Sequence, residues 1–537
     1  MQWHWFAILG AHLIVTGCSL FLGESEADEA FHPGIEALAR LRIIGENPYD
    51  YGSLWVGQRS TRSFVLTNAG SFPLTLQSQA FSSEDFEIHG LDFPGEGGTC
   101  PTTLPPGAEC VLPIDYAPYV GGANHQVMTL YFEYRGKNHS TQLQLNGHGY
   151  TGESGTIDTQ TFGASGLVQV GADYVLFDIA IQTNRRILGV GQTSGGMNAV
   201  RLLENGVIDT SFSTDGWAIG SVGTGITISN AVRLQSDGKS VVFGYGVNGN
   251  AFGALVRYRT DGSLDTDFGT SGVAIHAVGG VGLGFNEGGI QTDGKLVAVG
   301  FGDTEIFLAR YLTSGSLDTS FHTDGLLLTN PTGGNESGNR LVFTTDGKIL
   351  VAGHLQPSAE VLLLRYESDG QLDLSFGTNG WLMDDWLASF WFLTSHASTI
   401  ELQTDGKFLL GANKRGDLSF GFSRYRSDGH LDTTFATNGR LTTSYSNDSH
   451  VIQSVKINKN GSFYAFGNFT TDAATYNPVV ARFLSNGSVD TSFHGTGYLT
   501  VANSGTGFPK GFAVQRDGKV VLSGHAGDKF NFIRVWP

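Results

Sequence analysis

The sequence predicts an all-β protein whose larger part is a closed ring of seven similar units, a seven-bladed β-propeller. Three observations predict this fold. A nine-residue motif recurs along the second part of the chain, the segments between its copies are typical of short strands, and one copy is divided between the two ends of the region. Repeats of this period are typical of solenoids, propellers and arrays.

The recurring motif begins with Arg and ends with Asp, with Gly at its sixth position. A seventh copy is divided: RVWP (534–537) carries its start and SGTID (154–158) its end, and together they restore it with no residue missing. An open solenoid needs capping ends, whereas a closed ring needs ends that complete one unit. Residues 151–537 are therefore predicted to form the ring. The six undivided copies begin at Arg201, Arg257, Arg310, Arg365, Arg424 and Arg482.

Each unit is expected to contain four short strands. In the second unit these are predicted at 231–235, 239–245, 252–258 and 272–277, where Val, Leu, Ile and aromatic residues suit a pleated sheet. The first two are joined by Asp-Gly, which favours a type I′ hairpin turn. Because the divided unit is cut between its third and fourth strands, LVQV (167–170) is expected to supply the missing fourth strand and remove an open edge.

The repeats resemble the delta-sixty (delta-60) repeat of bacterial surface proteins. The matching text is LQSDGK (234–239) and TDGSLDTDFG (260–269), and the resemblance extends over residues 154–537. It implies a propeller-like fold and no assigned chemistry.

The first residues of the chain are apolar and end in VTGC (15–18). This text resembles a bacterial lipoprotein signal, which implies that residues 1–18 direct export and that Cys18 is lipidated. Ser19 after the cysteine implies the outer membrane. The alternative is an ordinary secretory signal or a short membrane anchor, because no Lys or Arg precedes Cys18.

Residues 19–52 are predicted to form an acidic spacer. ESEADE (24–29) favours disorder, and IEALARLRII (35–44) is long enough for about two helical turns.

Residues 53–150 resemble the immunoglobulin-like domain of the choice-of-anchor D and hydin type, on text such as FVLTNAGSFPLTL (64–76) and LQLNGHG (143–149). The resemblance implies a β-sandwich, which the alternating short strands also favour. It also places Cys100 and Cys110 close enough to pair as a disulfide, in keeping with an oxidising compartment. Two free thiols or a metal pair are the alternatives. The other matching residues are Asn68, Gly70, Phe86, Gly107, Pro118 and Gly147.

The composition bears on the classes of partner. Lys and Arg number 32 against 50 Asp and Glu, a net charge of −18, so nonspecific nucleic-acid binding is not expected. Beyond the first residues no apolar stretch approaches the length of a membrane-spanning helix, so membrane contact is expected through the lipid anchor alone. No cofactor is predicted.

The repeated Asp of the motif has two interpretations. DGSLD (261–265) resembles the second half of a calcium loop, but the first ligand position is Arg in every copy, and a cation opposes a divalent ion there. The favoured interpretation is a structural, charge-assisted hydrogen bond between each Arg and the Asp eight residues on. No metal site is predicted.

A functional residue should occur where one unit departs from its siblings. The largest departure is WLMDDWLASFWFLTSHAST (381–399), rich in aromatic residues and carboxylates. Exposed aromatics beside carboxylates suit sugar binding or a protein interface; the alternative is packing between blades. The adjacent carboxylates point to opposite faces of a strand and make a poor acid/base pair. The ligand-binding candidates are Asp384, Asp385, Trp386, Phe390 and Trp391.

These observations predict an exported, lipid-anchored binding or scaffold protein of the bacterial envelope. A monomeric ring is expected to recognise a glycan or a protein at the outer membrane or cell surface, with no catalytic residue. Two alternatives stay open: a propeller enzyme of glycosidase or lyase type, for which titratable residues from several blades should meet at the ring centre, and a purely structural envelope protein.

Overall fold

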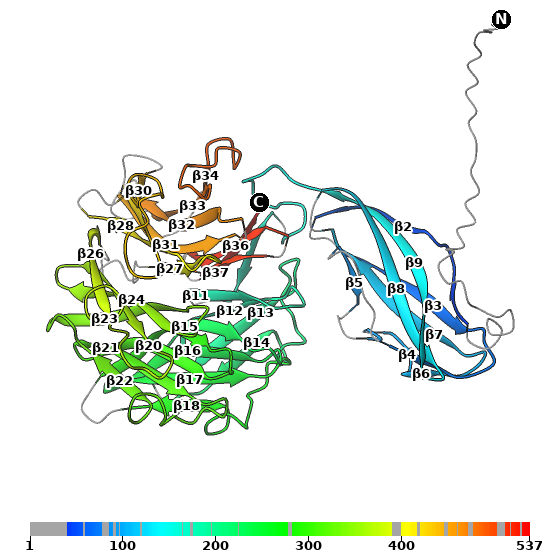
Figure 1. Ribbon diagram of the computed structural model, residues 1–537, viewed down its shortest axis with the longest axis horizontal. Helices are drawn as coiled ribbons and strands as arrows, with labels where there is room; N and C mark the ends of the chain where they lie inside the picture. Colours follow the sequence, from blue (N-terminus) through cyan, green and yellow to red (C-terminus); the bar gives the residue numbers. More distant parts are fainter. Residues whose placement is uncertain are drawn as a thin grey trace, which may run out of the picture.

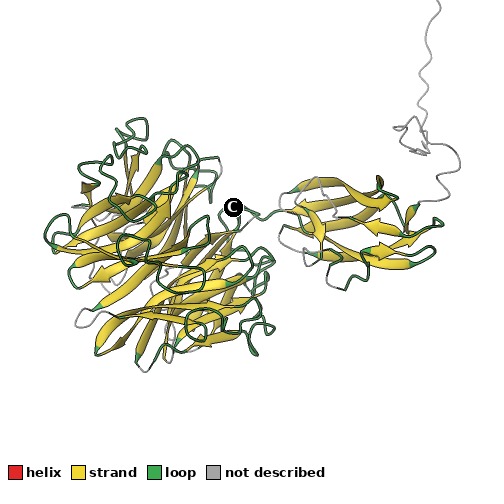
Figure 2. Cartoon of the chain, turned by 60° about the horizontal axis from the view of Figure 1, so that its bottom comes forward, coloured by secondary structure: helices red, strands yellow, loops and turns green. Residues whose placement is uncertain are grey.

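The computed structural model describes residues 40–537 except 57–58, 78–84, 90–92, 96, 119–120, 164, 172–174, 195, 224, 278–281, 389–398, 416–418, 445–448, 459, 471–475, 502–510, 516 and 527–528. Its regular elements are all β-strands (Figures 1 and 2), which confirms the predicted all-β class. Over these ranges no helix is long and apolar enough to cross a membrane.

Residues 41–150, here called the two-sheet unit, form two sheets around one core. Burial alternates along the longest strands, so every second side chain enters the space between the sheets. One sheet has the order β1 (Leu41–Ile44), β3 (Ser60–Asn68), β7 (Glu109–Tyr116) and β5 (Phe86–Ile88). The other has the order β2 (Tyr49–Trp55), β9 (Lys137–Tyr150), β8 (Gly122–Tyr134), β4 (Leu74–Leu76) and β6 (Thr103–Leu104).

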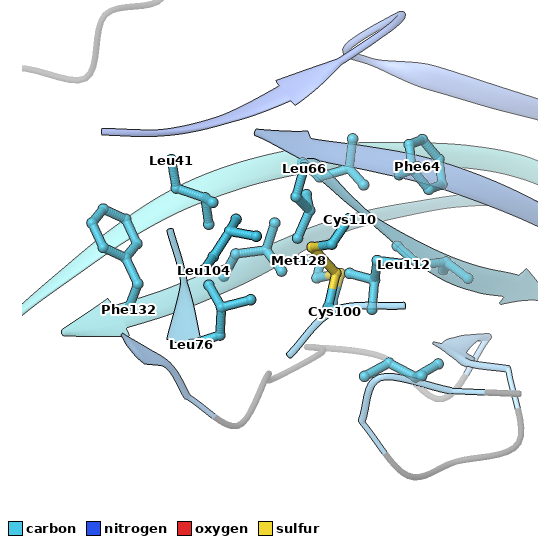
Figure 3. Close-up of a cluster of buried hydrophobic side chains, with 14 of the residues drawn as sticks. Leu41, Phe64, Leu66, Leu76, Cys100, Leu104, Cys110, Leu112, Met128 and Phe132 are labelled. Carbon is cyan, nitrogen blue, oxygen red and sulfur yellow. A yellow bond between two sulfur atoms is a disulfide. The ribbon is translucent and has the colours of Figure 1, made fainter. Parts of the chain in front are cut away.

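The core of the two-sheet unit contains the disulfide (Figure 3). Cys100 and Cys110 are bonded and almost fully buried, beside Leu112 and Met128, so the predicted pairing is confirmed. The structure gives a role to Asn68, one of the matching residues named for residues 53–150. Its buried side-chain amide donates to the carbonyls of Phe72 (2.8 Å) and Leu104 (2.9 Å).

The two-sheet unit begins earlier than residue 53. β1 pairs with the end of β3, and Leu41 is buried in the core. The helical turns expected over 35–44 are therefore wrong for residues 41–44, because pairing with a neighbouring strand outweighs a weak local helix preference. The last residues of the predicted spacer, 19–52, therefore belong to the two-sheet unit. Its earlier part and Cys18 lie outside the described residues.

The second part of the chain is a β-propeller built from sets of four antiparallel strands. In the second set β15 (Ile226–Leu234), β16 (Ser240–Asn248), β17 (Asn250–Tyr258) and β18 (Val273–His276) match the four predicted strands. Two pairs of neighbouring sets are joined by short pairings into eight-stranded sheets.

The other described strands form sets of the same kind. The first is β11 (Val175–Ile181), β12 (Ile187–Ser194), β13 (Met197–Leu202) and β14 (Trp217–Gly220). The third is β19 (Leu283–Ile290), β20 (Leu296–Gly302), β21 (Glu305–Tyr311) and β22 (Leu326–Thr329), and the fourth is β23 (Asn335–Phe343), β24 (Ile349–Gln356), β25 (Glu360–Tyr366) and β26 (Trp381–Ala388). The fifth is β27 (Thr399–Leu402), β28 (Phe408–Lys414), β29 (Phe420–Tyr425) and β30 (Arg440–Thr443), and the sixth is β31 (Ser449–Ile457), β32 (Phe463–Thr470), β33 (Tyr476–Phe483) and β34 (Tyr498–Thr500).

The last set joins the two ends of the propeller. It contains β35 (Gly511–Val514), β36 (Val520–Ala526), β37 (Lys529–Val535) and, from far earlier in the sequence, β10 (Leu167–Val170). β10 pairs antiparallel with β37, so the prediction for LVQV is confirmed. The first strands of successive sets contact one another in a closed cycle, β11, β15, β19, β23, β27, β31, β35 and again β11.

The turns between first and second strands differ from the predicted type. In the second set Gly238 donates its N–H to the carbonyl of Gln235 (3.0 Å), and the positive φ falls on Gly238 (82°). This pattern is a turn followed by a left-handed Gly, rather than a two-residue type I′ turn. Asp237 caps it by accepting from the N–H of Lys239 (3.1 Å).

Candidate functional site

The repeated Arg and Asp of the motif pair in every set. Nε of the Arg donates to Oδ2 of the Asp at 2.6–2.9 Å, and both side chains are mostly buried. The predicted structural pair is confirmed, including the pair formed by the divided copy. The pairs are Arg201–Asp209, Arg257–Asp265, Arg310–Asp318, Arg365–Asp373, Arg424–Asp432, Arg482–Asp490 and Arg534–Asp158.

Six of these Arg side chains, all but Arg482, also donate to a backbone carbonyl of the next set. Nη1 of Arg257 donates to the carbonyl of Thr313 in the third set (2.5 Å), and its guanidinium lies 4.5 Å from the ring centre of Phe268. The Arg therefore joins its own Asp, a Phe of the same set and the backbone of the next set. Stacked rings equivalent to Phe268 are Phe212, Phe321, Phe376, Phe435, Phe493 and Phe162.

The repeated Asp also pairs with a second cation, a Lys, which the sequence analysis did not predict. Lys295 of the Asp-Gly-Lys turn lies 3.1 Å from Asp318, and Lys407 lies 3.2 Å from Asp432. Burial by itself would raise the pKa of Asp432, but hydrogen bonds from Thr434 and the cations of Lys407 and Arg424 lower it to about 2. The recurrence of Lys in these turns was the available signal. The repeated charges thus hold the ring together.

The first strands bring a different set of charges to the centre of the propeller. Arg233 on β15 donates to Asp178 on β11 (Nη1–Oδ2 2.7 Å) and to Glu287 on β19. Arg340 on β23 lies 3.5 Å from the same Glu287. We call these four residues the central network. It links the first strands of four successive sets, and the residue type at these positions changes from set to set.

The charges of the central network are balanced. Burial alone would lower the pKa of Arg233, but Glu287 and Asp178, and then Glu401 on β27, raise it above its ordinary value. Glu401 is itself paired with Lys456 on β31. The carboxylates therefore face cations, an arrangement that can exchange hydrogen bonds with hydroxyl or ionic groups of a ligand.

Bulged amides reinforce the same strands. β15, β19 and β23 each carry a bulge, at Asn230, Asn286 and Asn339. The Asn230 amide donates to the carbonyl of Phe285 (2.8 Å), and the Asn286 amide to that of Gly338 (2.9 Å). A bulge re-aims a side chain, and here it directs an amide to the next set.

The predicted ligand-binding candidates are only partly brought together. Asp384 is almost fully buried: it accepts from the Tyr425 hydroxyl (2.6 Å) and the N–H of Trp386 (3.0 Å). The prediction that Asp384 contacts a ligand from an exposed position is therefore wrong, because the carboxylate serves the fold. The side chain of Asp385 is 84% exposed. Phe390 and Trp391 lie outside the described residues.

The half-buried Trp386 packs against the core between β25 and β28. Arg440 on β30 lies over its ring (5.4 Å) and 3.7 Å from Asp385. Trp386 thus has the packing role named as the alternative, while Asp385 and Arg440 form a small surface pair on the outer strands of the fourth and fifth sets.

Two cavities lie between the turns of neighbouring sets. One, of about 550 Å³, lies between Asp405 and Asn460, and the other, of about 410 Å³, between Asn184 and Gly238. Both are lined by side chains of the turns and of the Arg–Asp motif. His354 is buried elsewhere, and burial lowers its pKa to about 4, so it stays neutral at physiological pH.

Comparison with known proteins supports the fold. The family described as "Domain of unknown function (DUF5122) beta-propeller" matches residues 235–268, 291–321, 344–376 and 459–493. No curated protein matches the chain. Each matched segment runs from a turn between first and second strands to the stacked Phe three residues after the repeated motif.

The similar solved structures are distant. The VesB protease of Vibrio cholerae is 20% identical over 20% of this chain, with a TM-score of 0.17, and the chain spans 31% of it. A quinonprotein alcohol dehydrogenase-like protein of Bacteroides thetaiotaomicron is 9% identical over 84% of this chain and 95% of its own, with a TM-score of 0.37. The polysaccharide lyase Uly1 is 11% identical over 69% and 98%, with a TM-score of 0.38. The family matches and the repeated strand sets identify the chain as a β-propeller repeat protein.

Proposed function

We propose that this chain is an exported, lipid-anchored binding or scaffold protein of the bacterial envelope. Each four-strand set is one blade of a seven-bladed propeller, and the two-sheet unit is an immunoglobulin-like sandwich that separates the propeller from the anchor. The propeller recognises a glycan or an envelope protein without chemistry, as a monomeric ring.

The repeated Arg–Asp pairs carry this proposal. The motif places an Arg, an Asp and in most sets a Lys at equivalent positions, and these charges bind one another and the next set. The repeated residues are thus used to hold a rigid ring, so recognition falls to residues that differ between sets. Binding sites on rigid scaffolds are commonly carried by such variable surface positions.

Export is supported by two features. The apolar N-terminal text ending at Cys18 is typical of a lipoprotein signal. The disulfide between Cys100 and Cys110 suits an oxidising compartment outside the cytosol. Incorporation of radiolabelled palmitate in a bacterial host, abolished by Cys18→Ser, would support the anchor. Unchanged labelling of Cys18→Ser would contradict it.

The recognition site is best sought at the surface pair of Asp385 and Arg440. This charged surface pair offers a hydrogen-bond donor and acceptor, which suits a sugar or a polar peptide. The test is a glycan and envelope-fraction binding screen of the purified chain and its Asp385→Ala and Arg440→Ala variants. Asp267→Ala is the matched control, because the side chain of Asp267 is 86% exposed on a different set.

Loss of binding in both site variants but not in the control would support this location. Binding that survives in every variant would place recognition elsewhere. Absence of binding by the unaltered chain would favour the purely structural alternative.

The central network favours one second candidate, a propeller enzyme of glycosidase or lyase type. Asp178, Glu287 and Glu401 come from three sets, as such an enzyme requires, although each faces a cation. Hydrolysis or elimination of an envelope polysaccharide that disappears in Glu401→Gln, with the fold intact, would establish it. A polysaccharide that is bound but not altered would support recognition without chemistry.

A further inference from the structure

The two-sheet unit and the propeller meet through a group of charged side chains. Arg185, in the first turn of the propeller, lies 3.5 Å from Glu87 on β5, and Arg59 of the two-sheet unit lies 4.0 Å from Glu204 of the propeller. In Figure 1, β5 lies on the side of the two-sheet unit that is nearer the propeller. The contact is made on the propeller face that carries the Asp-Gly turns.

Arg185 is a departure from the repeat. The other turns place Gly at this position, as at Gly238 and Gly294, whereas Arg185 adopts the same left-handed conformation with φ 66°. A non-Gly residue there costs about 1 kcal/mol or more. The side chain is nevertheless 5% exposed and lies between Glu87 and Glu204, 3.5 Å from each. The first turn is therefore modified for contact with the two-sheet unit.

Glu204 is a second departure at the same place. The equivalent residues of the next five motif copies are small hydroxyl side chains, for example Thr260 and Ser368. Burial raises the pKa of Glu204, and the guanidiniums of Arg185 and Arg59 oppose that rise. Two substitutions that distinguish the first set from its siblings thus converge on one contact.

The two-sheet unit holds its own side of the contact in place. Arg59 pairs with Glu87 (3.0 Å) and with the fully buried Asp115. Asp115 also accepts from the Thr61 hydroxyl (2.6 Å) and lies 2.9 Å from Nδ1 of His89. A side chain held from several directions loses little further entropy when it meets a partner.

A second contact comes from the last set. Lys519 is fully buried and donates to the carbonyl of Val56, while its ammonium lies 4.0 Å from the ring centre of Trp536. Trp536 packs so closely on Gly152 that a Cβ there would lie 2.2 Å from its Nε1. The chain that leaves the two-sheet unit is therefore held on the same propeller face.

We propose that the Asp-Gly-turn face of the first and last sets is a docking site for the two-sheet unit of the same chain, so that the two parts form one rigid body. This assignment does not depend on which ligand is bound. Docking leaves the opposite face of the propeller, with hairpins such as Asn248–Asn250, directed away from the two-sheet unit. If the proposed function holds, that face stays accessible to a ligand.

The test measures the distance between the two parts of the full chain. Spin labels are placed at Val127→Cys on β8 and Ile275→Cys on β18, both exposed, in a Cys18→Ser background. Double electron–electron resonance of this labelled chain, with no other change, is expected to give one narrow distribution of the distance between the two labels. Arg185→Gly, which restores the residue of the repeat and removes strain, is expected to broaden it and increase the undocked population about tenfold.

Ser271→Gly is the matched control, because Ser271 also has a positive φ (54°) but lies in the second set. It should leave the distribution narrow. Arg185→Glu, which places a third carboxylate between Glu87 and Glu204, should broaden it at least as much as Arg185→Gly. A broad distribution in the unaltered chain, or a narrow one in Arg185→Gly, would overturn the docking proposal. Because ligand binding is not measured, these results are independent of the proposed function.

Discussion

The guanidinium of Arg534 donates to the carboxylate of Asp158 at 2.9 Å across 376 positions of the sequence. Both side chains are fully buried, and Lys519 lies 3.3 Å from the same carboxylate. Burial alone would raise the pKa of Asp158, but Lys519 and Arg534 hold it below its ordinary value. The Arg534–Asp158 pair therefore joins the two ends of the propeller with the same hydrogen bond that the other Arg–Asp pairs form within one continuous stretch of chain.

Asp158→Asn should therefore destabilise the propeller more than the same change elsewhere. It leaves the buried Arg534 without its anion and Lys519 with Asp517 alone (3.4 Å), and breaking a buried pair from one side costs about 3–5 kcal/mol. The partly exposed Asp490, which pairs with Arg482 at 2.8 Å, is the matched control, and Asp490→Asn should cost about 1 kcal/mol. Urea unfolding of both variants measures the difference. Equal losses would show that closure depends on β10 and not on this pair.

The paired carboxylates also predict an acid limit to stability. The folded pKa of Asp432 is about 2, below its ordinary value of 3.8. A lowered pKa contributes stability above the ordinary value, and that contribution is lost as the pH falls. The urea midpoint should therefore stay level down to about pH 4 and drop between about pH 4 and 2, with a shallower drop in Asp432→Asn. A loss completed above pH 5 would implicate other groups, such as histidines.

The ring could be predicted from the sequence because its stabilising residues repeat. The Arg and Asp of the motif, such as Arg257 and Asp265, recur at one spacing. The divided copy shows that the two ends of the propeller meet. The boundary at residue 53 was wrong for a different reason. β1 and β2 are short and lie in mixed sequence, and their assignment depends on pairing with β3 and β9, which no local pattern reveals.

The central network could not be predicted for a related reason. Asp178, Arg233, Glu287 and Arg340 occupy first strands of different sets, and their residue types do not recur from set to set. Only the closed ring brings them together. Asp384 failed as a candidate because it is buried, whereas its neighbour Asp385 is exposed, although both lie near Arg440 (3.8 and 3.7 Å). The sequence shows two carboxylates, but not that one of them points into the core.

Removal of the disulfide should weaken the two-sheet unit alone. The bond closes a loop of 10 residues between Cys100 and Cys110, and such a loop contributes roughly 2–3 kcal/mol in the chain-entropy account. In Cys100→Ser/Cys110→Ser, hydrogen exchange should accelerate in β3 while β16 keeps its protection. Equal acceleration in both strands would mean that the docked parts unfold as one cooperative unit.

Asp384→Asn should reduce stability, because its carboxylate is buried and bonded within the fold. The carboxylate accepts from the Tyr425 hydroxyl and from the N–H groups of Trp386 and Leu387. Weakening these buried bonds costs about 1–3 kcal/mol. Asp385→Asn, one residue later on the surface, should be nearly neutral in stability. Thermal unfolding of the two variants separates the roles, and a neutral Asp384→Asn would contradict a structural one.

The central network offers the sharpest separation of a structural from a catalytic role. Arg233→Met leaves Asp178 without this cation and Glu287 with only the longer contact to Arg340 (3.5 Å), and a loss of about 1–3 kcal/mol is expected because Arg233 is partly exposed. Adding Asp178→Asn and Glu287→Gln removes the uncompensated charges and should recover most of that loss.

Chemical unfolding measures this recovery, and turnover of envelope polysaccharides is followed in the same variants. A recovered fold that still binds its ligand would make the network a neutral lining of the ring. A recovered fold that has lost a polysaccharide-cleaving rate would instead make these carboxylates the catalytic groups, because neutral amides keep the packing and hydrogen bonds but cannot transfer a proton.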